Sequence, residues 1–529
     1  MSLVFAACSS SPSPIVHVDK MVDVIATDAA LTDAKTSPKV YPERALPASL
    51  RTVVHIHSAF SHDACDNWIT DHNGDVNQTC IGQLRAALCA SGLDVAFLTD
   101  HPARMKDHTF EELLFIEKTK GDVPVLKDGA PIANRIQCPA GSGLPAHELE
   151  IMVGYETTHT MPVGLYRHYT DTTSEGQADN DDVPFALARA AIDNAHAVGG
   201  IVVNAHSEED SISAQRLIDV GVDAMEIYNL HANFLTITGQ GSSGLKPNIG
   251  RVLKLENFLG DAATSPDSDL ALMVMLDIQP EQAFLKWQAV LGHKHVTGLL
   301  GNDVHQNVIL PQLCAVGSDY AGLCDGLKDQ YPKLTKLLTD GGPVILSDGK
   351  RIDDYTRMLR WVQDRVVVPA DTKLEDRSEV IKQAILAGKV WAEFDVLGIP
   401  EGADFYGDDG TQWVEMGGQI AAGQKLWVHT PTIALAPWST WTLADTQKPG
   451  DATEVRTLVW RIAPGADKAE QVAEIAGMGQ TQAVTADKPG RYHVEVRMKA
   501  RHLRAGLKAL GDLADVEQRW TVSNPIVVK

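Results

Sequence analysis

Short apolar runs alternate with amphipathic segments along the chain up to about residue 400. Four or five apolar residues bounded by Gly or polar residues are typical of buried strands, whereas apolar positions spaced i, i+3, i+4 and i+7 indicate helices. On this basis we expect strands at 53–57, 95–98, 151–155, 201–204, 224–228 and 296–300. Helices are expected at 80–91, 184–198, 213–220, 269–291 and 378–387.

Strands that alternate with helices through short connections pair in parallel. We therefore predict an α/β domain over 49–398, built as a distorted (β/α) barrel of about seven strands. After residue 400 the pattern changes to short alternating runs, such as 425–429 and 491–498, separated by Gly and Pro. This change predicts a small β-sandwich over 399–529, interrupted by a short helix at 501–515.

Length and charge narrow the choice of function. The 529 residues exceed one ordinary domain, and an apolar fraction of 44% is normal for a globular chain. The net charge of -23, without a run of Lys or Arg, disfavours nucleic acid and anionic membranes as partners. A small-molecule substrate is expected, and an anionic one would require bound metal ions to invert the local charge.

The first 48 residues are interpreted as a truncated signal region followed by a flexible leader. Residues 3–7 are apolar, Cys8 follows, and Ser and Pro come next, as in a lipobox. Cys8 would then be lipidated and would anchor the protein to the cell envelope, on its periplasmic or extracellular face. An accidental cysteine in a disordered tail is the alternative.

Six further cysteines form an even set, which in an exported protein indicates disulfides. Cys314 and Cys324 flank a short polar loop and are the favoured pair, and Cys65 with Cys80 is the second choice. Buried reduced thiols are the alternative. The partners of the remaining cysteines, Cys89 and Cys138, stay open.

Histidines and carboxylates gather where the predicted strands end. In α/β barrels the carboxyl ends of the strands form the active site. Imidazole and carboxylate suit Zn, Mn or Fe, and a carboxylate can bridge two ions through its two oxygens. We therefore predict a centre with two or three divalent transition metals. Its candidate ligands are His55, His57, Asp63, His101, Glu156, His159, His206, Asp303 and His305.

Such a centre predicts hydrolysis by a metal-activated hydroxide that attacks phosphorus or a carbonyl carbon. No serine nucleophile is required, and the chain has neither a G-x-S-x-G elbow nor a P-loop. The predicted catalytic residues are Asp303, His206 and His305. Either histidine can protonate the leaving group where metal does not occupy it fully.

Five short motifs carry these residues in one order along the chain. They are His55-Ile56-His57-Ser58-Ala59-Phe60-Ser61, Thr99-Asp100-His101, Gly154-Tyr155-Glu156, Asn204-Ala205-His206 and Gly301-Asn302-Asp303-Val304-His305. This series resembles the motifs of the PHP (polymerase and histidinol phosphatase) family. The resemblance implies a PHP barrel and a metal-dependent phosphoesterase. The segments 224–229 and 385–391 resemble the exported carbaryl-hydrolase-like branch, which is related to amidohydrolases.

The resemblance also implies how the ligands are shared. By position, one metal would be held by His55, His57, Glu156 and Asp303. A second would be held by Glu156, His101 and His159, and a third by Asp63, His206 and His305. The chain departs from the family pattern after Ser61, where His62 and Asp63 stand, so that either residue is a candidate ligand.

Other residues near the strand ends have expected supporting roles. We expect Asp100 to orient His101 through a hydrogen bond. Glu226 is either a buried partner of a ligand or an ordinary strand residue. Candidate substrate contacts are Asn229, His231, Arg104 and Arg167, with a solvated loop as the alternative for each arginine.

Three functions remain open. The first is a phosphoesterase, the second a hydrolase of carbamates, amides or carboxyl esters, and the third a surface-anchored binding protein with a structural metal site. The ligand set favours the enzymes, whereas the predicted β-sandwich and lipid anchor are compatible with the third.

Overall fold

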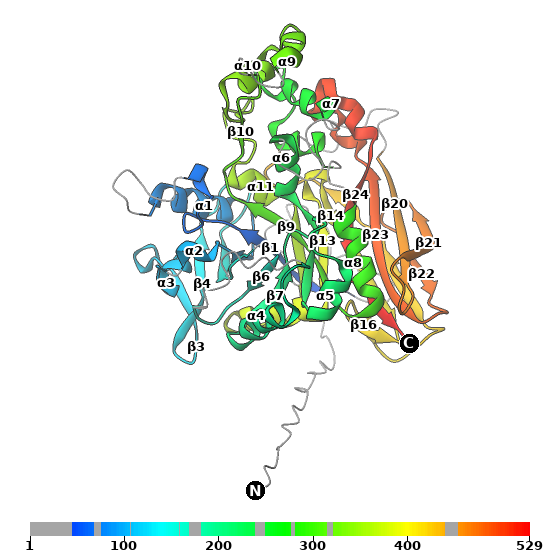
Figure 1. Ribbon diagram of the computed structural model, residues 1–529. Coiled ribbons are helices and arrows are strands. Elements are labelled where there is room, and N and C mark those ends of the chain that lie inside the picture. Colours follow the sequence, from blue (N-terminus) through cyan, green and yellow to red (C-terminus); the bar gives the residue numbers. More distant parts are fainter. Residues whose placement is uncertain are drawn as a thin grey trace.

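The protein is a mixed α/β molecule with one large mixed sheet and additional small antiparallel sheets (Figure 1). The computed structural model describes residues 45–67, 76–105, 107–157, 159–168, 181–238, 249–276, 281–314, 321–439 and 453–529. Cys8 and almost all of the predicted leader lie outside the described residues.

Six strands form the parallel part of the large sheet, at or near the positions that the hydrophobic pattern predicts. They are β1 (Ala48–Ile56), β2 (Val95–Leu98), β5 (His147–Val153), β7 (Ile201–Asn204), β8 (Ala224–Asn229) and β9 (Thr297–Val304). β1 pairs in parallel with β2 and β9, β2 with β5, and β8 with both β7 and β9. The parallel pairing is therefore confirmed, and the burial of these strands explains their continuous apolar runs.

Before residue 400, five described strands that the hydrophobic pattern missed extend this sheet through antiparallel pairing. They are β3 (Val123–Lys127), β4 (Ala130–Cys138), β6 (Thr160–Val163), β12 (Gln363–Val368) and β13 (Val390–Glu393). β3 and β4 form a hairpin beside β5, β6 pairs with β7, and β12 pairs with β1. Two backbone hydrogen bonds also connect β6 with the end of β5, from Tyr155 to Pro162 and from Leu165 to Val153.

Most helices lie where the sequence predicts them. The matching helices are α1 (Gln78–Ala90), α4 (Phe185–Ala197), α5 (Ala214–Val220) and α12 (Arg377–Ala387). The single helix predicted over 269–291 was wrong, because a 3-10 segment at Ser268–Val274 precedes a separate α8 (Gln282–His293). Shorter helices are α2 (Pro102–Met105), α3 (Phe110–Leu113), α6 (Leu230–Thr238), α7 (Ile249–Val252), α9 (Ala321–Leu327), α10 (Pro332–Asp340) and α11 (Tyr355–Trp361). Among the described residues, no helix combines the length and the apolar character needed to cross a bilayer.

The C-terminal part is rich in antiparallel strands, as predicted. One small sheet contains β15 (Asp404–Asp408), β16 (Trp413–Glu415), β18 (Lys425–His429) and β22 (Thr481–Thr485). Two strands, β14 (Ile399–Glu401) and β19 (Thr432–Ala434), pair separately. The others are β17 (Gln419–Ile420), β20 (Glu454–Ile462), β21 (Ala469–Ala476), β23 (Gly490–Lys499), β24 (Glu517–Ser523) and β25 (Ile526–Val528). Because β24 pairs with β13, one ladder of hydrogen bonds crosses the predicted boundary at residue 399.

Two further local predictions are confirmed. The short helix expected at 501–515 is present as α13 (Arg504–Leu507), flanked by 3-10 segments. The disulfides Cys314–Cys324 and Cys65–Cys80 are both formed, and the third disulfide joins Cys89 to Cys138.

Candidate metal centre

Four buried residues from three strand ends converge on one point, and we call them the inner group. They are His55 and His57 at the end of β1, Glu156 after β5, and Asp303 in β9. His55 Nε2 lies 3.4 Å from Glu156 Oε2 and 3.2 Å from Asp303 Oδ1. His57 Nε2 lies 3.3 Å and 3.4 Å from the same two oxygens. Two imidazole nitrogens and two carboxylate oxygens thus surround a shared position.

The inner group fits a metal ion. His55 Nε2, His57 Nε2 and Asp303 Oδ1 are buried and have no hydrogen-bond partner in the structure. A buried polar atom without a partner costs about 1–3 kcal/mol, so three in one place require compensation. A divalent transition metal would accept electron pairs from all three atoms and from Glu156.

Uncommon backbone conformations orient three of the candidate ligands. His55, His206 and Asp303 all have positive φ, at 69°, 51° and 52°. The pairing of β1 with β2 and with β9 also shifts register across His55. Such bulges and left-handed residues are uncommon and cluster at functional sites. A bulge at His55, rather than regular strand alternation alone, therefore brings His55 and His57 together.

A second set of ligands, the outer group, contains Asp63, His101 and His305. Asp63 Oδ2 lies 3.3 Å from His101 Nε2 and 3.2 Å from His305 Nε2. The ring of His57 stacks on His305, with centroids 3.8 Å apart, so the outer group adjoins the inner one. Of the two residues left open by the sequence, Asp63 joins the cluster, while the exposed His62 ring packs against His101.

A third set, the His206 group, uses the remaining oxygens of the two shared carboxylates. His206 Nε2 lies 3.0 Å from Glu156 Oε1 and 3.7 Å from Asp303 Oδ2. Glu156 and Asp303 therefore each face both the inner group and the His206 group. The grouping in the structure differs from the sets that the motifs imply: Asp63 Oδ2 faces His101 and His305, whereas His206 faces Oε1 of Glu156.

His159, a predicted ligand of the second metal, does not join any of these groups. Its Nε2 lies 2.8 Å from Ser211 Oγ, and its Nδ1 lies 3.2 Å from the carbonyl oxygen of Ala205. The cause is β6, which begins at Thr160 opposite Asn204 of β7 and draws the preceding residue toward Ala205. The motif spacing alone did not reveal this antiparallel strand.

Hydrogen bonds to the second ring nitrogen orient the histidines. Glu226 Oε1 lies 2.6 Å from His55 Nδ1, and Glu226 Oε2 accepts from the backbone N–H of His206 at 2.8 Å. Ser61 Oγ lies 3.1 Å from His57 Nδ1, and the Glu156 carbonyl lies 3.1 Å from His101 Nδ1. Such bonds fix the tautomer and direct Nε2 toward a metal. Of the two roles considered for Glu226, the structure supports the buried partner.

Glu208 is a supporting residue that the sequence reasoning missed. It is 6% exposed, and its Oε1 lies 3.2 Å from His206 Nδ1. The sequence did contain a signal that could have identified Glu208, because this acidic residue follows the candidate ligand His206 by two positions at a strand end.

Asp100 acts on a different residue from the one predicted. It accepts hydrogen bonds from the backbone N–H and the hydroxyl of Ser58, the latter at 2.7 Å. The side chain therefore fixes the turn after His57 rather than orienting His101. Both carboxylate oxygens are used by Ser58 because the end of β2 lies beside the end of β1.

The four candidate substrate contacts divide into two pairs. Asn229 Nδ2 lies 3.3 Å from Asp303 Oδ2, and the His231 ring lies 4.8 Å from the His305 ring, so both adjoin the centre. Arg104 and Arg167 are exposed and, within the described part of the chain, contact none of the cluster residues. For the two arginines the solvated alternative agrees with the structure.

Charges of opposite sign stabilise one another in the centre. Burial lowers the pKa of His55, but Asp303, Glu156 and Glu226 outweigh burial and raise it to about 10. Burial opposes ionisation of Glu156 and Asp303, yet His55 and its neighbours hold both pKa values well below the ordinary range. Burial lowers the pKa of His231 to about 3, so this ring is neutral. The carboxylates thus favour positive charge at the cluster.

The sequence and the structure of this chain were compared with those of known proteins. No model of a known protein family matches it, and no curated protein sequence matches it. Among solved structures, the chain resembles a two-domain protein from Bacteroides vulgatus that contains a predicted PHP-like metal-dependent phosphoesterase. The identity is 12%, the match covers 85% of this chain and 90% of that chain, and the TM-score is 0.29.

Proposed function

We propose that this protein is a metal-dependent hydrolase of the PHP type, whose strands β1, β2 and β5–β9 form a distorted barrel around the centre. One observation carries the proposal: three buried potential ligand atoms, of His55, His57 and Asp303, form no hydrogen bond and point at one position. Their residues belong to motifs that resemble those of PHP enzymes. The predicted cofactors are two or three divalent ions of Zn, Mn or Fe.

The accessibility of the centre favours catalysis over a purely structural metal site. The side chains of His101, His206 and Asp63 are 20%, 19% and 29% exposed, while those of His55 and His57 are fully buried. Structural metal sites are closed, whereas catalytic sites keep a position open for water or substrate. The outer and His206 groups lie where a substrate could enter.

The metals would activate the nucleophile, and the residues would hold the metals and the substrate in place. Metals held here would supply Lewis acidity and a hydroxide nucleophile at neutral pH. Glu156 and Asp303 would fix the spacing of the inner and His206 groups, since each faces both. Asn229, whose amide lies beside Asp303, would contact the substrate, and the neutral His231 ring would offer it a hydrogen bond.

We propose a phosphoester as the first substrate class, since adjacent metals suit the charged oxygens of a phosphoryl group. One observation favours a carbamate or carboxyl ester as the second. Within the described part of the chain, no Lys or Arg side chain forms an ion pair or hydrogen bond with a residue of the three groups. Among the described residues, this arrangement suits a neutral ester better than an anion. Hydrolysis of p-nitrophenyl phosphate, inhibited by inorganic phosphate, supports the first class, and preference for an aryl carbamate supports the second.

The decisive experiment compares two buried glutamates, Glu150 within β5 and Glu156 just after it. Glu156→Gln should lower the bound metal and abolish turnover, because it removes the carboxylate shared by two groups. Glu150→Gln is the control, since Glu150 is equally buried but bonds Arg135 and Ser378 instead. Wild-type protein that binds none of Zn, Mn or Fe after loading would exclude the hydrolase. Ligand binding without turnover in wild-type protein would favour the binding-protein alternative.

We also propose a location in the cell envelope, with Cys8 as the lipidated residue. Three disulfides support it, because they persist in oxidising compartments. Cys8→Ser should release the protein from the membrane fraction and prevent incorporation of labelled fatty acid. Unchanged fractionation would contradict the anchor.

A further inference from the structure

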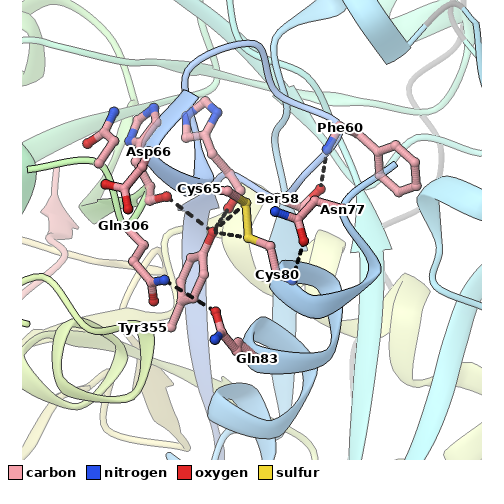
Figure 2. Close-up of a disulfide and its surroundings, with 12 residues drawn as sticks. Ser58, Phe60, Cys65, Asp66, Asn77, Cys80, Gln83, Gln306 and Tyr355 are labelled. Carbon is pink, nitrogen blue, oxygen red and sulfur yellow. Dashed lines mark hydrogen bonds between the residues drawn. A yellow bond between two sulfur atoms is a disulfide. The ribbon is translucent and has the colours of Figure 1, made fainter. Parts of the chain in front are cut away.

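Figure 2 shows Tyr355 beside the Cys65–Cys80 disulfide, close to the loop that carries Asp63. Tyr355 is buried, and its hydroxyl lies 3.2 Å from the carbonyl oxygen of His57 and 3.1 Å from that of His305. The same hydroxyl lies 3.8 Å from Cys65 Sγ and 3.5 Å from Cys80 Sγ. The hydroxyl thus joins the backbones of two candidate ligands to the disulfide.

The disulfide begins in the loop that carries Asp63. The backbone N–H groups of Cys65 and Asp66 donate to the carbonyls of His305 and Gln306, at 3.0 Å and 3.1 Å. Asn307 Nδ2 donates to the carbonyl of Asp63 at 2.9 Å. The Asp63 loop is therefore joined to the residues after β9, and Cys65 covalently fixes it to α1 through Cys80.

Helices α1 and α11 make this attachment rigid. They pack against each other, and Arg360 of α11 donates to the carbonyl of Ala90 at the end of α1. Tyr355 is the first residue of α11, whose N-cap Asp354 accepts from two backbone N–H groups of the first turn. One helix pair thus carries both the disulfide partner and the tyrosine.

We propose that Tyr355 and the Cys65–Cys80 disulfide are positioning groups that set the geometry of Asp63 and His305 for one metal ion. The proposal rests on the function proposed above and assigns a support to the outer group. His55 of the inner group is oriented by Glu226. His57 borders both groups, because its carbonyl accepts from Tyr355, and Ser61 lies beside its Nδ1 while donating to Asp63 Oδ1 at 2.8 Å. Asp63, the most exposed candidate ligand, lies in a loop, so ordering it when metal binds costs conformational entropy. The disulfide lowers this cost because it restricts the loop before metal binds.

The test counts zinc ions and measures their individual affinities in the full-length oxidised protein, stripped of metal and reloaded with Zn²⁺ alone. Tyr355→Phe removes only the hydroxyl. It should weaken one equivalent of zinc about 10- to 100-fold, the usual effect of losing a group that supports ligands, and affect the other equivalents much less. Asp63→Asn identifies the affected equivalent. The double variant Asp63→Asn/Tyr355→Phe should bind no more weakly than Asp63→Asn, because both changes act on the same ion.

Matched disulfide variants separate positioning from general stabilisation. Cys65→Ser/Cys80→Ser should weaken the same equivalent as Tyr355→Phe, whereas Cys314→Ser/Cys324→Ser should weaken none. Uniform weakening of all equivalents, or unchanged zinc affinity in both Tyr355→Phe and Cys65→Ser/Cys80→Ser, overturns the inference. Wild-type protein that binds no zinc contradicts the proposed function instead, so the two failures are distinguishable.

Discussion

The carboxylate of Glu226 lies directly against the α-carbon of Gly301. A β-carbon at Gly301 would overlap Oε1 and Cδ of Glu226, so only glycine leaves room for this side chain. The contact links two neighbouring strands, since β8 carries Glu226 and β9 carries Gly301. Because Glu226 holds His55 and the backbone of His206, the glycine acts on the metal centre without touching it.

Gly301→Ala should therefore displace Glu226 and weaken metal binding about 10- to 100-fold. Overpacking of the buried strands should also lower the free energy of unfolding by about 1–3 kcal/mol. The control is Gly82→Ala in α1, where a β-carbon meets no atom within 4 Å. That change should leave metal affinity unchanged and raise stability by about 0.5–1 kcal/mol. Metal titration and denaturant unfolding measure both effects; equal metal affinities in the two variants would contradict the role of Gly301.

Glu226→Gln keeps the volume of the side chain but removes its charge. His55 Nδ1 then loses a charged partner at 2.6 Å, and we expect a 10- to 100-fold loss of metal affinity. Glu495→Gln is a suitable control, because Glu495 is equally buried and bonds Arg497 and Arg519 in the C-terminal part. Calorimetric titration with Zn²⁺ gives the affinities. A similar loss in both variants would indicate that general destabilisation, not orientation of His55, is the cause.

The structure and the motif spacing make opposite predictions for His159. We expect His159→Gln to leave the number of bound metal ions unchanged, because His159 Nδ1 faces the carbonyl of Ala205 and Nε2 faces Ser211. His206→Gln should instead lose most of one equivalent, because His206 faces both shared carboxylates. Elemental analysis after metal loading decides between them. Loss of a whole equivalent in His159→Gln would restore the ligand set implied by the motifs.

The pH dependence of stability should differ in sign between the metal-free and metal-loaded protein. The pKa of His55 is about 10 in the folded protein against an ordinary 6.5, so its stabilising effect is complete below pH 6.5 and is lost as the pH rises toward 10. The pKa of Glu156 lies below its ordinary 4.5, so its effect is present above pH 4.5 and is lost as the pH falls.

Metal-free protein should therefore be most stable between about pH 4.5 and 6.5. Metal requires neutral imidazole, so loading should release protons. Because folded His55 keeps its proton up to about pH 10, stabilisation by metal should increase as the pH rises from 6.5 toward 10. Thermal unfolding across this pH range, with and without Zn²⁺, measures both profiles. Two profiles of the same shape would show that the histidines do not exchange protons for metal.

The hydrophobic pattern predicted the parallel strands β1, β2, β7, β8 and β9 because a strand buried on both faces must be apolar throughout. The His, Asp and Glu residues at the strand ends then predicted a shared metal centre, since parallel strands bring their carboxyl ends to one edge. The resemblance to PHP motifs implied which four of them form the inner group. The structure also explains why two of the motifs contain glycine, since a side chain at either position would overlap its neighbours. Gly154 faces the carbonyl of Pro162, and Gly301 faces Glu226.

The sequence by itself thus determined the strand–helix alternation, the candidate ligands and two of the three disulfides, because local patterns encode burial and loop closure. Only the tertiary structure decided which ligands share a position. Residues distant in the chain meet through strand pairing, so β6 turned His159 toward Ser211, while Asp63 met His101 and His305. The orientation of the His55 and Asp303 side chains depends on a positive φ at each residue, and the pattern of polar and apolar residues does not predict backbone dihedral angles.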